Sequence, residues 1–528
     1  MRRFRFANIP SLQCFCLGAM ATLALAPLNF WPAMIALVPP LVMMASAPDA
    51  KMAARLAFMT SWGWLFASLY WIGQSLLVEG GAVLLLLPVV MLGLPAGLAL
   101  FWALSVWLAY RLSPCPEMRL VWIALGIGCA DILRSVIFTG FPWNVMAHLF
   151  LVSDISSQSI YFTGQHALNL VAICGIAGLA FIWQRRFVWA IWLLLPALFL
   201  MVIGANRLIS REQAIVAVNA ASHLPDIRII QPNISQKEKW QRGKQDQHLA
   251  EMIKLANQQN PVPPLLILPE TAIAALWPKD QEKAVNFVQK IAPFDGYVLA
   301  GMLRLEQRSM LHNTAFLFSQ SGQPVARYDK IHLVPFGEYA PFRFIPFVDV
   351  IAGPIDFSSG MSAQPYLQLP QDSPLAGLKI ALLICYEVIF SGFLDRVKSA
   401  DDSAADIIVN LTNDGWFGHT TGPYQHLAQA RFRAIEEAKP LVRVANTGIS
   451  AVFDRYGAEL GSIGLARAGF LDIQLDRTAK KLPQTPLWKD IARPLFGMIM
   501  LLMVMAFYLI PLFCLEIFRQ TQDKSNVK

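Results

Sequence analysis

Three expected strand ends in the middle of the chain carry polar residues that could do chemistry. Leu266-Ile-Leu-Pro-Glu270 ends in a carboxylate, and Ile384-Cys385-Tyr-Glu387 supplies a thiol beside another carboxylate. Between them, the segment from Tyr328 to Tyr339 carries Lys330 and Glu338. A short apolar run is typical of a buried strand, and the turn that follows such a strand can expose a reactive side chain.

These residue types together fit covalent acyl transfer. A thiol with a pKa of about 8.5 needs a nearby base before it is a good nucleophile. A carboxylate that is partly desolvated beside a cation can be that base. A lysine ammonium and a backbone N–H can stabilise the oxyanion that follows. Taken singly, Glu270 could be an ordinary paired glutamate and Cys385 a small core residue. Only the combination of carboxylate, lysine and thiol indicates acyl transfer.

The cysteine and histidine patterns narrow the chemistry further. The chain has seven cysteines, and six of them lie in or beside apolar segments. Only Cys385 falls in the polar middle region, where it has no cysteine partner for a disulfide. The eight histidines show no HExxH or paired CxxC spacing, and there is no glycine-rich phosphate loop. We therefore expect no metal ion and no cofactor.

The overall composition is that of a membrane protein. Of 528 residues, 55% are hydrophobic and only 15% are charged, whereas soluble proteins average about 25% charged residues. The length exceeds one hydrophobic core, which predicts a membrane domain and a separate water-facing domain. The net charge of +8 is explained by the cytoplasmic bias of Lys and Arg in membrane proteins, so we expect no nucleic-acid partner.

The expected membrane domain covers residues 1–210, with a last span at 495–518. Each apolar segment is close to the roughly 20 residues that cross a bilayer. Lys and Arg occur in the loops after the second, fourth and sixth segments and are absent from the alternate loops. This pattern places the N-terminus in the cytoplasm, residues 225–482 outside and the tail 519–528 back inside. The seven segments of the first domain lie at about 12–28, 31–47, 56–78, 82–110, 120–140, 159–183 and 187–205.

Two charged residues, Asp131 and Arg134, lie inside the fifth apolar segment. Their i, i+3 spacing places them on one helix face, where they could form a structural pair. A charge buried in a membrane is also a reason to suspect a function. Both interpretations are open at this point.

The middle region, residues 225–482, changes to short apolar strands alternating with helices. This order predicts a mixed α/β sandwich. The segment 341–360 is different, because it is rich in Phe, Ile and Val but interrupted by proline. It is either a loop packed on its own domain or an apolar flap that faces the membrane or an acyl chain. Strands are expected at 227–231, 265–268, 297–302, 314–319, 325–329, 378–384, 406–411, 441–446 and 450–454, and helices at 244–258, 280–291 and 423–439.

Several of these motifs resemble a known group of enzymes. Pro269-Glu270, the segment 328–339 and Cys385-Tyr-Glu387 resemble the nitrilase or carbon–nitrogen hydrolase superfamily. With eight predicted spans, Asn413-Asp-Gly-Trp-Phe417 and Gly422-Pro-Tyr-Gln-His426, the whole chain resembles the apolipoprotein N-acyltransferase family. The resemblance implies a polytopic α-helical membrane domain and a nitrilase-like αββα sandwich.

The resemblance also implies roles for individual residues. Glu270 would be the general base, Lys330 the oxyanion stabiliser and Cys385 the nucleophile. Glu338 would be a second essential carboxylate, and the Tyr386 N–H a second oxyanion donor. The remaining supporting positions that it implies are Glu387, after the nucleophile, Trp240, and the aromatic loop residues Trp416 and Phe417 at the site entrance.

The activity that the resemblance implies is N-acyl transfer by a ping-pong route. The acyl chain of a membrane phospholipid would pass through a Cys385 thioester to the α-amine of a diacylglyceryl-cysteine at a lipoprotein N-terminus. The protein would lie in a bacterial inner membrane with the catalytic domain in the periplasm and both termini in the cytoplasm. Two alternatives remain: a membrane-anchored amidase or nitrilase with water as acceptor, and a transporter or receptor whose outer domain only binds a ligand.

Overall fold

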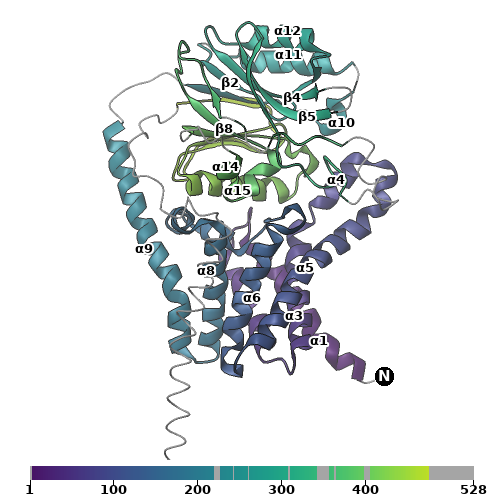
Figure 1. Cartoon of the computed structure of the whole chain (residues 1–528), viewed down its shortest axis with the longest axis vertical. Helices are drawn as coiled ribbons and strands as arrows, with labels where there is room; N and C mark the ends of the chain where they lie inside the picture. The colour runs from purple at the N-terminus through teal and green to yellow at the C-terminus, as the bar shows by residue number, and fades with distance from the viewer. Residues whose placement is uncertain are drawn as a thin grey trace, which may run out of the picture.

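The computed structural model describes residues 3–218, 226–241, 243–259, 261–306, 310–341, 356–361, 364, 366–397 and 405–474. Residues 342–355 of the expected apolar flap and the whole of the expected last span and tail lie outside these ranges. A helical domain carries an α/β sandwich at one end (Figure 1).

The helical domain contains the expected apolar segments, although several of them are not single continuous α-helices. The run 56–78 is divided at Tyr70 and Trp71, and the run 120–140 leaves its α-helix at Arg134. Within the described part of the chain, Val83–Leu112, Ser159–Trp183 and Phe187–Ile209 are long and apolar enough to cross a membrane. The count of seven spans stays a prediction. The helices are α1 (Arg3–Ala21), α2 (Val38–Ala45), α3 (Ala50–Leu69), α4 (Ile72–Glu79), α5 (Leu87–Leu112), α6 (Arg119–Arg134), α7 (Asp154–Ser157), α8 (Ser159–Trp183) and α9 (Phe187–Val218).

Small residues let helices α1 and α3 approach each other closely. A Cβ atom at Gly18 would lie 2.0 Å from the Thr60 carbonyl oxygen, and one at Gly63 would lie 1.9 Å from that of Phe15. Helices in lipid gain no hydrophobic energy by meeting, so backbone contact of this kind is a main source of their association. Glycine at these two positions is therefore required by the packing.

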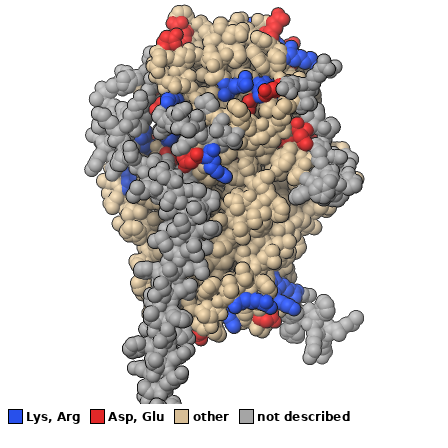
Figure 2. Space-filling model, viewed as in Figure 1, with Lys and Arg blue, Asp and Glu red and all other residues tan. Residues whose placement is uncertain are grey.

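Charge is distributed as expected for a protein that crosses a membrane. Figure 2 shows Lys and Arg gathered at the end of the helical domain far from the sandwich, below a band of uncharged surface. Glu117, in the loop after α5, interacts electrostatically with Arg186, in the loop after α8, and with Arg119. These loops therefore share one end of the domain, as the alternation of basic and neutral loops predicts. The side of the membrane on which this end lies stays a prediction.

The second domain is a sandwich of two mixed sheets. Among the described residues, one sheet has the order β13-β1-β2-β4-β5-β6, with β3 beside β4, and the other has the order β12-β11-β10-β9-β8-β7. Every expected strand is present. The strands are β1 (Ile227–Gln231), β2 (Leu265–Ile267), β3 (Ile273–Trp277), β4 (Tyr297–Glu306), β5 (Met310–Ser319), β6 (Pro324–Asp329), β7 (Leu367–Gln368), β8 (Lys379–Ile384), β9 (Ile407–Thr412), β10 (Leu441–Ala445), β11 (Ser450–Phe453), β12 (Glu459–Ile463) and β13 (Gly469–Ile473).

Helices cover both outer faces of this sandwich. Helices α11 (Gln245–Ala256) and α12 (Gln281–Ile291) pack on one sheet, while α14 (Phe393–Val397) and α15 (Gly422–Glu437) lie between the other sheet and the membrane domain (Figure 1). In β8, Ile380 and Leu382 face the core between the sheets, whereas Ala381 and Leu383 face the layer of α15. This alternation with period two fixes which way the strand presents its end.

Candidate active site

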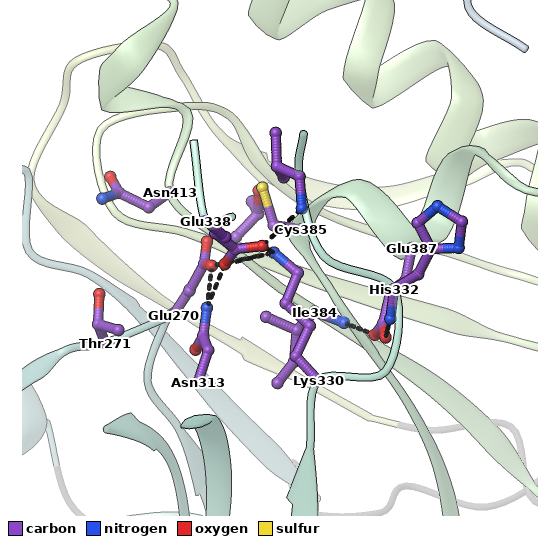
Figure 3. Close-up of polar contacts among 12 residues, drawn as sticks. Glu270, Thr271, Asn313, Lys330, His332, Glu338, Ile384, Cys385, Glu387 and Asn413 are labelled. Atoms are coloured by element: carbon purple, nitrogen blue, oxygen red, sulfur yellow. Dashed lines mark hydrogen bonds and ion pairs between the residues drawn. The ribbon is translucent and has the colours of Figure 1, made fainter. Parts of the chain in front are cut away.

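The polar strand ends predicted from the sequence meet in one place, shown in Figure 3. Glu270 follows β2 of one sheet, Lys330 follows β6 of the same sheet, and Cys385 follows β8 of the other sheet. Strands β2 and β8 each run parallel to a neighbour. The carboxyl ends of parallel strands are where open α/β sheets form their sites, because the chain turns there and frees polar groups.

Lys330 is held between two carboxylates. Its Nζ atom lies 2.9 Å from Glu338 Oε1 and 3.7 Å from Glu270 Oε1. Lys330 is only 1% exposed and Glu270 only 7% exposed. Two anions therefore share one cation in a setting with little water, where charge interactions are strong.

Asn313 on β5 joins the two carboxylates and was not predicted from the sequence. Its Nδ2 atom donates to Glu270 Oε1 at 2.7 Å and to Glu338 Oε1 at 3.1 Å. Glu338 Oε2 also accepts from the backbone N–H of Val334 at 2.8 Å. Among the described residues, three different donors bind the Glu338 carboxylate, whereas the Glu270 carboxylate accepts one hydrogen bond and faces a more distant ammonium.

The surroundings shift the pKa values of Glu270 and Lys330 in directions that suit catalysis. Burial raises the pKa of Glu270, the neighbouring Glu338 carboxylate raises it further, and Lys330 and Asn313 oppose this only in part. Burial alone would lower the pKa of Lys330, but Glu338 and Glu270 raise it above its usual value. Lys330 therefore stays protonated at neutral pH, while Glu270 is a stronger base than an ordinary glutamate.

Cys385 lies at the turn after β8, with its thiol within electrostatic range of Glu270 and Lys330. Its backbone is in the left-handed region, with φ at 51°. A non-glycine residue adopts this conformation only where its surroundings hold it there. Burial and the Glu270 carboxylate raise the pKa of the Cys385 thiol to about 12. The resting group is therefore a thiol, and it needs a base at the moment of reaction.

Glu387 supports the turn that carries Cys385 through hydrogen bonds to the backbone. Its carboxylate accepts from the backbone N–H groups of Ile384, Ile331 and His332 at 2.7, 2.7 and 3.0 Å. It also accepts from the Tyr328 hydroxyl at 3.1 Å. Because Ile384 precedes Cys385 and Ile331 follows Lys330, the Glu387 carboxylate joins the two strand ends. Burial raises the pKa of Glu387 to about 7.

A second lysine, Lys239, supports the segment that carries Glu270 and was also missed. It lies at the end of α10 (Gln236–Lys239), is 2% exposed, and donates to the Glu270 carbonyl oxygen at 3.2 Å and to Thr271 Oγ1. Trp240, the next residue, is 43% exposed. The predicted tryptophan therefore directly follows the lysine that binds the backbone of Glu270.

Aromatic residues from the membrane domain meet those of the site. The ring of Phe417 lies 4.5 Å from that of Trp71 and 6.1 Å from that of Trp143. The hydroxyl of Tyr386 donates to the Gly140 carbonyl oxygen at 2.9 Å. Trp416 is half-buried in the short turn that precedes Phe417. The predicted aromatic loop therefore lies at the junction of the two domains.

Models of two protein families match the two domains of the chain. Residues 226–481 match the model of the carbon–nitrogen hydrolase family, and residues 17–178 match that of the apolipoprotein N-acyltransferase N-terminal domain. An amidase from Nesterenkonia sp. of known structure is 19% identical, with 49% of this chain and 93% of that chain covered and a TM-score of 0.35.

Two relatives are similar along most of the chain. An apolipoprotein N-acyltransferase of Rhizobium leguminosarum bv. trifolii is 33% identical over 495 residues, which cover 88% of this chain and 90% of that protein. One of Brucella melitensis biotype 1 is 32% identical over 506 residues, covering 90% and 91%. The resemblance seen in the sequence motifs is confirmed, and so is the nitrilase-like sandwich: the chain belongs to the apolipoprotein N-acyltransferase family.

Proposed function

We propose that this protein is an N-acyltransferase that moves an acyl chain from a membrane phospholipid to the N-terminal amine of a diacylglyceryl-lipoprotein. The observation that carries the proposal is the cluster of Glu270, Lys330 and Cys385 beside a domain junction lined with aromatic side chains. The relatives are named apolipoprotein N-acyltransferases, which gives the reaction class. The two lipid substrates explain why the protein has a membrane domain.

In the first half of the reaction, Glu270 takes the proton of the Cys385 thiol, and the thiolate attacks the carbonyl carbon of the phospholipid ester. Lys330 and the Tyr386 N–H stabilise the oxyanion of the tetrahedral intermediate. The intermediate collapses and expels the lysophospholipid alkoxide, which takes the proton from Glu270. The products of this half are a Cys385 thioester and a lysophospholipid.

In the second half, the neutral α-amine of the lipoprotein attacks the thioester carbonyl carbon. Glu270 removes the extra proton of the attacking nitrogen and returns it to the departing Cys385 sulfur. A thiolate is a better leaving group toward an amine than an alkoxide is, which gives the cysteine its advantage over serine. Glu338 keeps Lys330 in place through both halves, because it binds the ammonium at 2.9 Å.

The decisive test is the intact mass of the purified protein after incubation with phospholipid and no acceptor. We expect a gain of one acyl chain that hydroxylamine removes and that is absent in Cys385→Ala. Cys174→Ala, which removes a buried thiol from helix α8, is the matched control and should keep the adduct. Addition of a diacylglyceryl-peptide should then discharge the wild-type adduct.

Two outcomes would contradict the proposal. If the wild-type protein gains no mass from phospholipid but forms an adduct with a soluble amide and releases ammonia, the hydrolase alternative is correct. If the adduct persists in Cys385→Ala, the nucleophile is a different residue.

A further inference from the structure

The backbone carbonyl of Cys385 has a partner that the proposed mechanism does not use. His426, on α15, places its Nε2 atom 3.2 Å from the Cys385 carbonyl oxygen. A carbonyl oxygen only accepts hydrogen bonds, so Nε2 carries a proton in the state that makes this bond. The imidazole is completely buried, so it contacts the Cys385 backbone carbonyl directly and not through solvent.

The imidazole ring is itself held in place. Its Nδ1 atom lies 2.9 Å from Asp414 Oδ1 and 3.2 Å from a nitrogen of Arg443. Asp414 also binds Arg443 at 2.6 Å and the Thr412 hydroxyl at 3.0 Å. Thr412 ends β9, the strand beside β8. The orientation of His426 is thus set by buried charges attached to the neighbouring strands of the same sheet.

This carbonyl belongs to the same peptide unit as the Tyr386 N–H. A trans peptide is planar, and its C=O and N–H point in opposite directions. A bond that fixes the direction of the Cys385 carbonyl therefore fixes the direction of the Tyr386 N–H as well. Because Cys385 is in the left-handed region, with φ at 51°, this plane needs external support to stay as it is.

The residue before His426 connects the same helix to the membrane domain. The Gln425 side-chain oxygen accepts from Trp143 Nε1 at 2.9 Å, from Asn144 Nδ2 at 3.1 Å and from Trp71 Nε1 at 3.2 Å. All four side chains are buried. Adjacent helix positions point about 100° apart, so α15 presents one side chain to the membrane domain and the next to the nucleophile turn.

We propose that His426 is a positioning residue for the oxyanion hole, which orients the Tyr386 N–H through the Cys385 carbonyl, and that Gln425 anchors it to the membrane domain. The inference rests on the proposed function, since it concerns the acylation of Cys385. It adds that the domain junction and the oxyanion donor are mechanically connected through two consecutive residues of α15.

A pair of amide variants separates the two contacts of the imidazole. Glutamine carries its amide nitrogen at about the reach of Nε2, so His426→Gln can still donate to the Cys385 carbonyl. The amide nitrogen of asparagine reaches only about as far as Nδ1. His426→Asn therefore keeps a donor for Asp414 but loses the hydrogen bond to the Cys385 carbonyl. His148→Asn, which removes another buried imidazole packed on Phe432 of α15, controls for the loss of a buried ring.

The measurement is the pre-steady-state acylation of Cys385 by p-nitrophenyl butyrate, beside alkylation of the same residue by iodoacetamide. Acylation develops an oxyanion and alkylation does not. In His426→Asn we expect the acylation rate constant at saturating ester to fall about 10-fold or more, with an unchanged KM and an unchanged alkylation rate. His426→Gln and His148→Asn should stay within about threefold of the wild type.

Several results would overturn the inference. Equal acylation rates in His426→Asn and His426→Gln would show that the carbonyl contact is irrelevant. Equal losses in acylation and alkylation would mean that the turn is generally disturbed. If His426→Asn does not fold, Gln425→Met, which leaves the imidazole intact, should show the same selective loss at smaller amplitude, and an unchanged acylation rate there would count against the proposal.

The soluble ester also separates this inference from the proposed function. Wild-type protein that reacts with the ester but gains no mass from phospholipid would contradict the lipid donor and leave the His426 comparison valid. Wild-type protein that reacts with neither donor would overturn both proposals.

Discussion

Two clusters of buried charge, one in each domain, differ in how completely they are satisfied. In the membrane domain, Asp131 and Arg134 lie 3.4 Å apart and are each 3% exposed. Asp131 also accepts from Trp102 and Asn169, both at 3.0 Å. Arg134 donates to two backbone carbonyls, those of Phe141 and Trp143. One cation faces one anion, and each makes further hydrogen bonds.

The cluster in the catalytic domain is unbalanced. Lys330 faces two carboxylates, and only Glu338 is closely bound to it. Burial and the neighbouring Glu338 carboxylate raise the pKa of the surplus carboxylate, Glu270. A surplus carboxylate in a desolvated site is prepared to accept a proton, because burial disfavours its charged form. We infer that the balance of charges, more than burial itself, separates the structural ion pair from the candidate catalytic groups.

The sharpest way to test this comparison is Glu270→Gln. We expect the rate of thioester formation to fall about 10²- to 10⁴-fold, because the general base is lost. The unfolding temperature should rise, because a desolvated carboxylate beside Glu338 is removed and a balanced pair remains. Stopped-flow acylation and tryptophan fluorescence on heating, both in detergent, measure the two effects.

Glu338→Gln is the matched control, since it removes the other carboxylate of the cluster. Glu338 has three donors, so its loss should lower the unfolding temperature. The stabilisation by Glu270→Gln should also grow as the pH rises. A carboxyl group whose folded pKa is raised above its unfolded value costs stability as the pH increases through that range. A stabilisation that shrinks with rising pH would contradict the assignment.

The opposite behaviour is expected for Asp131→Asn. Removing one partner of a balanced buried pair leaves an uncompensated guanidinium and costs about 3 kcal/mol of stability. The acylation rate of the folded fraction should stay within about fivefold of the wild type, because Arg134 keeps its two carbonyl partners. Thermal unfolding and burst kinetics at low temperature test this.

Asp49→Asn provides the control for Asp131→Asn within the same domain. Asp49 caps helix α3 by accepting from the Met52 N–H, and asparagine caps helices equally well, so its unfolding temperature should not change. If Asp131→Asn abolishes acylation while the protein remains folded, the distinction between structural and catalytic charge clusters is wrong.

A smaller effect is expected from Asn313→Leu. The hydrogen bond from Asn313 lowers the pKa of Glu270, so its loss should raise that pKa further. Glu270 must be ionised to act as the base, and the acidic limb of the pH dependence of kcat/KM should therefore move to higher pH. Thr314→Val removes a neighbouring bond to Asp329 on the same strand and should leave the limb in place. A shift toward lower pH in Asn313→Leu would contradict the proposed base.

Much of this arrangement could be predicted from local sequence. The strands that end at Ile267 and Ile384 are short apolar runs, and Glu270 and Cys385 follow them within three residues. Lys330 directly follows β6, which mixes apolar and charged residues. A strand end is a local feature, because it depends on where an apolar run stops. The same holds for the apolar membrane segments, which composition alone reveals.

The breaks in these segments were not predicted. The run 56–78 has no proline and no pair of glycines at Tyr70 and Trp71, the two residues between α3 and α4. Its break coincides with the contact of Trp71 with Phe417 and Gln425 of the other domain. The edge strands β12 and β13 were also missed, because they are half-exposed and lack a continuous apolar run.

Local sequence was enough to predict the candidate nucleophile, the lysine and both carboxylates, the strands that precede them, and the presence of a membrane domain. Three features became visible only in the folded chain: Glu270 is the surplus carboxylate, Asn313 and Lys239 support it, and His426 contacts the Cys385 carbonyl. These contacts join residues that lie 31 to 43 positions apart in the chain. Periodicity carries no information at such separations, because the contacts exist only after two sheets and a helix have packed together.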